Sequence, residues 1–141
     1  MDNEYASKIA MHHVRRNKHH WEYWTDFLGG HIIALNMPWV YATEYVCDVL
    51  SASKTYDPKN FSPKVAYDYF LDKCDHYFMN EGTKDYIKYL FEELIQNGYK
   101  NLKKKNTKEK YKEITSKYSK VQVFDLPIKC RDLPPLNKSK N

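Results

Sequence analysis

A stripe of apolar side chains with helical spacing runs through residues 83–97, and it constrains the fold more than any other part of the sequence. Its members are Tyr86, Ile87, Leu90, Phe91, Leu94 and Ile95. Steps of three and four residues place these side chains on one side of an α-helix. Thr83 is suited to cap the start of this helix, and Gly98 is suited to the left-handed backbone that closes many helices. The stripe therefore predicts an amphipathic helix that packs against other apolar surface.

Two proline positions predict further helices. Pro38 is suited to the first turn of a helix over residues 38–53, and Ser62 followed by Pro63 is a good start for a helix over residues 63–79. Glycine is scarce, with 4 residues in 141, whereas there are 13 tyrosines. Such a chain is expected to pack through helices with aromatic faces rather than through glycine-cornered sheets. We therefore expect an all-α fold built as a helical bundle.

The remaining segments are expected to be less regular. Residues 25–37 contain two consecutive glycines and then a short apolar run, which predicts a loop with a short extended piece. Residues 100–120 are rich in lysine and poor in apolar anchors, so they are expected to form one exposed helix or a solvated linker. Residues 121–128 recover some apolar character and are expected to add a strand, lie across the helices or bind a partner in extended form.

The balance of basic and acidic groups changes near residue 100, where the lysine-rich segment begins. Residues 1–99 carry 10 basic and 14 acidic groups, whereas residues 100–141 carry 13 basic and 4 acidic groups. We therefore expect a helical domain over residues 1–99 and a basic, weakly structured extension over residues 100–141. The lysine-rich part can make weak contact with nucleic acid, and residues 121–136 are a candidate segment for binding a protein partner.

The three cysteines form no CxxC pair, and no apolar run is long enough to cross a bilayer. The first residues also lack the basic and apolar regions of a signal peptide. We expect a cytoplasmic protein with reduced thiols and no membrane association.

Histidines concentrate in one short segment, which is the strongest candidate for a functional site. Residues 12–24 hold four of the six histidines of the chain. A predicted helix over residues 3–24, with a break near Asn17 as an alternative, allows two neighbouring seams, one through His13 and His20 and one through His12 and His19. Each pair is separated by seven residues, so one imidazole of each pair falls on the same side of a helix.

Two such imidazoles and a carboxylate from another helix are natural ligands of a divalent transition metal. Three protein ligands leave positions open for water, and a metal-bound water of lowered pKa is the nucleophile of many hydrolases. Arg16, Asn17 and Glu22 are close enough in sequence to orient the ligands or to hold a phosphate oxygen. Asp48, which lies among apolar neighbours, is the carboxylate most expected to turn inward. Alternatively, the histidines are partly exposed groups that form hydrogen bonds without any metal.

The strings HHVRRNKHHWEYW and MPWVYATEYVCDVLSAS carry a resemblance to known proteins. They resemble a family of uncharacterised bacterial and phage-associated proteins with the patterns HHxxRNxHHWEYW and MPxxYxxEMVCDWL. That family looks related to the HD-domain superfamily of all-helical, metal-dependent phosphohydrolases, and the resemblance covers about residues 5–97. It implies a metal centre formed by His13, His20 and Asp48. The neighbours His12 and His19 are alternative ligands or groups around that centre, as are Arg16, Asn17 and Glu22.

One part of the family pattern is missing. Family members carry an upstream His-Asp pair, and no His-Asp dipeptide occurs in this chain. The chain is therefore expected to correspond to the later part of an HD-like domain. The resemblance implies a metal-dependent phosphohydrolase of nucleotides or other phosphate esters, or a degenerate copy of one, with a phosphate-containing small molecule as substrate. The alternative is a non-catalytic helical interaction protein of viral or mobile-element origin, which would dock through its C-terminal extension inside a bacterial or virus-infected cell.

Overall fold

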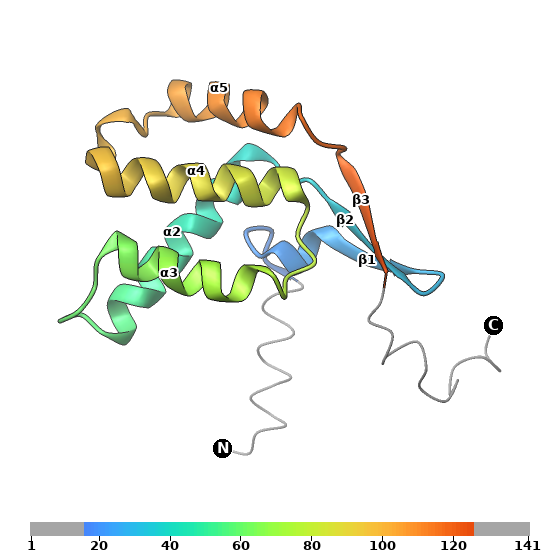
Figure 1. The fold of residues 1–141 in the computed structure, drawn as a ribbon, viewed down its shortest axis with the longest axis horizontal. Helices are drawn as coiled ribbons and strands as arrows, with labels where there is room; N and C mark the ends of the chain where they lie inside the picture. Colours follow the sequence, from blue (N-terminus) through green and yellow to red (C-terminus); the bar gives the residue numbers. More distant parts are fainter. Residues whose placement is uncertain (1–15, 126–141) are drawn as a thin grey trace, which may run out of the picture.

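A small antiparallel sheet lies at one end of a group of packed helices (Figure 1). The computed structural model describes residues 16–125. The elements, in chain order, are η1 (Trp21–Trp24), β1 (Thr25–Leu28), β2 (His31–Leu35), α2 (Trp39–Tyr56), α3 (Pro63–Cys74), α4 (Glu81–Asn97), η2 (Gly98–Asn101), α5 (Lys104–Thr115) and β3 (Val121–Asp125). The expectation of an all-α fold is therefore correct only in part, because the protein is mostly helical but also contains a three-stranded sheet.

The hairpin β1–β2 replaces the loop that was expected over residues 25–37. Thr25 pairs with Ala34 and Leu28 pairs with His31, so only two residues connect the strands. Those residues are Gly29 and Gly30, with φ angles of 57° and 81°. A two-residue hairpin turn with positive φ at both positions favours glycine, because a side chain is strained there. The predicted short extended piece is confirmed as β2, whereas the loop prediction is wrong for Thr25–Leu28, which forms the first strand of the hairpin.

Strand β3 completes the sheet on the other side of β2. Ile33 pairs with Val123, and Leu35 pairs with Val121, in antiparallel register. The prediction that residues 121–128 add a strand is confirmed for Val121–Asp125. The ring of Phe124 contacts the ring of Phe78, with centroids 5.8 Å apart, which attaches the sheet to the segment after α3. The rest of the predicted partner-binding segment, residues 126–136, lies outside the described residues.

The three predicted helices exist with shifted ends. Helix α2 runs three residues further than expected, and α3 begins as expected after Ser62, whose hydroxyl oxygen accepts a hydrogen bond from the Val65 amide at 3.2 Å. Helix α3 ends at Cys74 rather than at residue 79. The His76 amide donates to the Lys73 carbonyl at 2.9 Å, so the chain turns there and approaches the start of α4.

Helix α4 starts two residues earlier than the sequence predicted, because Asn80 rather than Thr83 is its N-cap. The Asn80 side-chain oxygen accepts a hydrogen bond from the Gly82 amide at 2.9 Å. Thr83 is instead buried, where its hydroxyl accepts from the Met37 amide at 2.9 Å and donates to Asn36 at 2.7 Å. At the other end Gly98 closes the helix with a φ of 67°, as expected.

The core lies between α2, α3 and α4. Its buried members are Met37, Ala42, Tyr45, Val46, Ala66, Tyr67, Phe70, Cys74, Met79, Tyr86, Ile87, Leu90 and Phe91. Four residues of the predicted stripe are in this set, and Leu94 is also buried, whereas Ile95 is exposed. Among the described residues, no helix combines the length and the apolar character that crossing a membrane requires.

Helix α5 packs alongside α4 (Figure 1). Thr107 is buried, and Tyr111 and Ile114 pack against the core. The Tyr111 hydroxyl donates to the Met37 carbonyl at 2.5 Å and accepts from the Asn36 side chain at 2.8 Å. Of the two alternatives for residues 100–120, the helix is confirmed and the solvated linker is wrong. The expectation of weak structure fails for these residues because a few inward side chains suffice to dock the helix.

Candidate metal centre

A turn, rather than a continuous helix, carries the second pair of histidines. Arg16 is helical but Asn17 is not, and the His20 amide donates to the Asn17 carbonyl at 3.1 Å. The indole nitrogen of Trp24 donates to the Lys18 carbonyl at 2.7 Å and holds this turn closed. The alternative of a break near Asn17 is therefore confirmed, and a continuous helix over residues 3–24 is wrong. Consequently, the seven-residue spacing does not determine which imidazoles share a side.

Three of the predicted site residues come together. His19, His20 and Asp48 each offer one ligand atom, and these atoms all lie within 4.8 Å of one another. The His19 Nε2 atom is 4.0 Å from Asp48 Oδ2, and the two imidazole rings have centroids 4.5 Å apart. His19 and His20 are placed by the turn, whereas Asp48 comes from the middle of α2. We call these three residues the His-Asp cluster.

The cluster differs from the ligand set that the sequence predicted. His12 and His13 lie outside the described residues, so the role of His13 stays a prediction. His19, expected as a neighbour of the site, takes a ligand position in the cluster. In the sequence, His19 belongs to the alternative seam through His12 and His19. The turn places it beside His20, which belongs to the other seam, so the cluster contains one histidine from each.

Asp48 faces solvent rather than the core. Its side chain is 50% exposed and that of His19 is 23% exposed. The expectation that Asp48 turns inward is wrong, because Tyr45 and Val46 supply the buried side of α2 at this point. The Asp48 carboxylate is therefore accessible from solution, whereas the His19 Nε2 atom beside it is buried.

The distances in the cluster are longer than those around a bound metal. Bonds of about 2.0–2.2 Å to histidine and carboxylate place tetrahedral ligand atoms about 3.4 Å apart. The His19–Asp48 distance of 4.0 Å must therefore shrink by roughly half an ångström. Metal binding therefore requires the side chains of the cluster to move closer together.

Aromatic side chains fasten this segment to the helices. Trp21 stacks on Tyr77 with ring centroids 5.2 Å apart, and Trp24 lies 5.8 Å from Tyr41 of α2. Both tryptophans pack against the core. The Lys18 ammonium lies 5.7 Å from the centre of the Tyr41 ring, which adds a cation–π contact. The tryptophans thus position the turn on α2.

Glu22 faces tyrosines instead of joining the cluster. Burial raises the pKa of the Glu22 carboxyl, and a weaker hydrogen bond from its own backbone opposes that rise. Its Oε1 atom is buried and has no hydrogen-bond partner among the described residues. Burial also raises the pKa of Tyr45, and the charges of Tyr77 and Glu22 raise it further. Glu22 therefore lies beside Tyr45, three residues before Asp48 on α2. Arg16, which was expected near a phosphate, is exposed.

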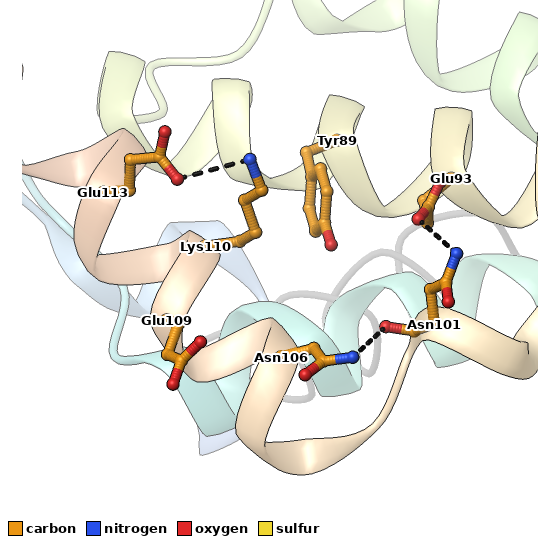
Figure 2. A pocket seen from close by; sticks show the side chains of 7 residues that line it. All are labelled: Tyr89, Glu93, Asn101, Asn106, Glu109, Lys110 and Glu113. Carbon is orange, nitrogen blue, oxygen red and sulfur yellow. Dashed lines mark hydrogen bonds and ion pairs between the residues drawn. The ribbon is translucent and has the colours of Figure 1, made fainter.

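A separate pocket of about 300 Å³ lies between α4, η2 and α5 (Figure 2). It is lined by Tyr89, Glu93, Asn101, Asn106, Glu109, Lys110 and Glu113. Its polar groups mostly bind one another. Lys110 Nζ is 3.2 Å from Glu113 Oε2, and the Asn101 side chain donates to Glu93 at 3.1 Å. None of the predicted site residues lines this pocket.

Comparison with known proteins gives one match. Residues 2–93 match the family model of a family of unknown function, DUF5662. No curated protein and no solved structure matches the chain. The matched range includes the histidine-rich segment and α2, and it ends before α5 and β3. The match shows no link to HD-domain proteins, so that relationship stays a prediction. Because the match spans more than half of the sequence, the chain belongs to the DUF5662 family of unknown function.

Proposed function

We propose that this protein binds a divalent transition metal ion through His19, His20 and Asp48. The proposal is supported by one observation, the convergence of two imidazoles and one carboxylate with ligand atoms within 4.8 Å. Neutral imidazole and ionised carboxylate are preferred donors for zinc, iron, nickel and copper ions, whereas calcium and magnesium prefer oxygen alone. The cluster therefore favours a transition metal over the hard cations.

The reaction that we propose for this centre is hydrolysis of a phosphate ester, such as a nucleotide. Three protein ligands leave room for water and for a phosphate oxygen, and a bound metal supplies a water of lowered pKa. That water would attack phosphorus, form the new P–O bond and expel the alcohol, which takes up a proton. Arg16 and Lys18 flank the cluster in sequence and supply positive charge for the phosphate.

Metal binding is tested by isothermal titration of the metal-free protein with Zn²⁺ and Mn²⁺. Alanine at His20 and asparagine at Asp48 are expected to abolish stoichiometric binding. Two control variants test specificity. Glu44→Gln removes an exposed carboxylate from the same helix, and His31→Ala removes an imidazole that pairs with Asp125 at 2.9 Å in the sheet. Both controls are expected to bind metal like the unaltered protein.

A comparison of His19→Ala with His13→Ala distinguishes the two ligand sets. If His19, His20 and Asp48 are the ligands, loss of His19 removes the metal and loss of His13 does not. The ligand set from the sequence resemblance predicts the reverse. Folded protein that binds no metal at all, with folding checked by circular dichroism, would rule out the centre altogether.

Hydrolysis is tested separately, with the metal-loaded protein and a panel of nucleoside monophosphates and p-nitrophenyl phosphate. Activity is expected to disappear in Asp48→Asn and to persist in Glu44→Gln. Stoichiometric metal without any phosphate release from this panel would remove the hydrolase proposal and leave the metal site intact.

A further inference from the structure

Helix α5 packs against the rest of the protein through a few side chains on one side of the helix. Thr107 is buried, and Tyr111 and Ile114 pack against the core. With 3.6 residues per turn, these three positions fall on one side of the helix. The other positions are divided between two flanks and the outer face, and on one flank all the charged residues are lysines.

One flank is entirely basic. Lys104, Lys108 and Lys112 follow one another at steps of four residues, with Lys105 beside them, and all four side chains are exposed. None of these four lysines forms an ion pair in the part of the chain that the structure describes. We call these four residues the lysine stripe. Its charge is therefore available to a partner.

The opposite flank holds the acidic residues of the helix. Glu109 and Glu113 line the pocket beside α4, together with Lys110 (Figure 2). Lys110 Nζ lies 3.2 Å from Glu113 Oε2, so this lysine is partly neutralised. Glu109 lies four residues after Lys105 and three before Lys112, but it forms no ion pair with either of them among the described residues.

The lysine stripe is held in a fixed position by Trp39, at the start of α2. The Trp39 indole nitrogen donates to Thr107 Oγ1 at 3.1 Å, which joins α2 to α5. The Lys108 ammonium lies 4.9 Å from the centre of the Trp39 ring, within the range of a cation–π contact. Because α5 is already packed on the protein, its row of lysines loses less conformational entropy when a partner binds.

From these observations we infer that the lysine stripe binds the phosphate backbone of nucleic acid. Steps of four residues space Lys104, Lys108 and Lys112 about 6 Å apart along the helix axis. A row of evenly spaced cations matches a polymer with one negative charge at every unit better than it matches a protein surface of mixed charge. Lysines that contact only phosphates carry no base readout, so the binding should have little sequence preference.

The test measures fluorescence anisotropy of a labelled oligonucleotide, single-stranded and duplex, titrated with the full chain. The key variant is Lys104→Gln with Lys112→Gln, which leaves the Lys108–Trp39 contact in place. The charge-matched control is Lys54→Gln with Lys59→Gln, two exposed lysines far from α5 in sequence. Titrations between about 50 and 200 mM salt give the slope of log K against log salt.

The stripe variant is expected to bind more weakly than the control and to have a duplex salt slope shallower by about 1.8, since each lost phosphate contact removes about 0.9. Equal affinities of the unaltered protein and the stripe variant would overturn the inference. Equal losses in the two double variants would also overturn it, because net charge alone would then explain binding. Stripe-dependent binding to phosphatidylserine vesicles without binding to oligonucleotides would identify a membrane surface as the partner instead.

Nucleic-acid binding and metal binding use different residues, so the two proposals can fail separately. Asp48→Asn is expected to bind the oligonucleotide like the unaltered protein. The stripe variant is expected to retain metal.

Discussion

The side-chain amide of Asn80 lies 3.2 Å from the carbonyl oxygen of Lys120 and donates to it. The same nitrogen is 3.0 Å from the Ser119 carbonyl and 3.3 Å from the Ala34 carbonyl, while the side-chain oxygen caps α4. Asn80 is buried. One amide group thus joins the start of α4, strand β2 and the approach to β3.

Asn80→Asp should destabilise the protein strongly. The variant keeps a capping oxygen, but it replaces the amide donor with a second carboxylate oxygen that faces three carbonyls. Loss of a buried donor and burial of a charge predict a free energy of unfolding lower by about 3 kcal/mol. Urea unfolding followed by circular dichroism gives this value. If Asn80→Asp is as stable as the unaltered protein, the donor does not contribute to stability.

Tyr111→Phe tests how α5 is attached. The phenol donates to the Met37 carbonyl and accepts from Asn36, so its removal leaves two partly buried polar groups without this partner. We expect a loss of about 1 to 3 kcal/mol in the free energy of unfolding. Tyr56→Phe is the control because Tyr56 is 92% exposed. Equal urea midpoints for these two variants would contradict the attachment through Tyr111.

Stability should fall at alkaline pH, partly because of Tyr86. Burial raises the pKa of Tyr86 to about 12, although hydrogen bonds with Thr43 and Thr107 oppose the rise. An unfolded tyrosine has a pKa of about 10. The folded state holds this proton more tightly, so its contribution is complete below pH 10 and is lost as the pH approaches 12. Two pKa units correspond to about 3 kcal/mol.

The measurement is urea unfolding of the unaltered protein and of Tyr86→Phe at a series of alkaline pH values. The variant is expected to lose less stability per pH unit than the unaltered protein, even if it is less stable at neutral pH. Tyr56→Phe should leave the pH dependence unchanged. Parallel pH curves for Tyr86→Phe and the unaltered protein would exclude this contribution.

A metal bound at the His-Asp cluster should stabilise the fold, because the cluster joins the turn that contains His19 and His20 to α2. At a free metal concentration 100 times the Kd, the gain is about 2.7 kcal/mol. A thermal melt with and without Zn²⁺ shows it as a rise in Tm. Asp48→Asn should show no rise, and Glu44→Gln should show the full rise. Equal rises in both variants would place the metal elsewhere.

Local patterns in the sequence were sufficient for much of the helical part of the fold. The apolar stripe predicted α4, and Gly98 closes this helix with a left-handed backbone as expected. The proline positions gave the starts of α2 and α3 to within one residue. The ends were less accurate. At the start of α4, Thr83 bonds to Asn36 and Met37, which are distant in sequence, and Asn80 caps the helix instead.

The sheet was harder to predict for two different reasons. Two consecutive glycines, Gly29 and Gly30, are a local sequence signal for a two-residue hairpin turn, although only a loop was predicted for them. The pairing of β3 with β2 is not local at all, so the sequence could only offer a strand as one of three alternatives for residues 121–128.

The sequence identified the histidine-rich segment and Asp48 as a candidate site, and metal binding by these residues stays a prediction. Periodicity alone did not decide between a continuous helix over residues 3–24 and a break near Asn17, and the structure shows the break. Once the chain turns at Asn17, His19 and His20 both approach Asp48. Similarly, apolar neighbours in sequence do not show which way Asp48 points, because adjacent helical residues face different directions.

The order of the strands has a consequence for biosynthesis. Strand β2 is central, but its second neighbour is made only after the 85 residues that separate Leu35 from Val121. At the usual speed of a ribosome this interval lasts about 4 to 17 seconds. During that time the main-chain groups on one side of β2 have no strand to pair with, and an open strand edge is a site for association with other chains. The nascent protein is therefore exposed to association through the edge of β2 until residues 121–125 have been made.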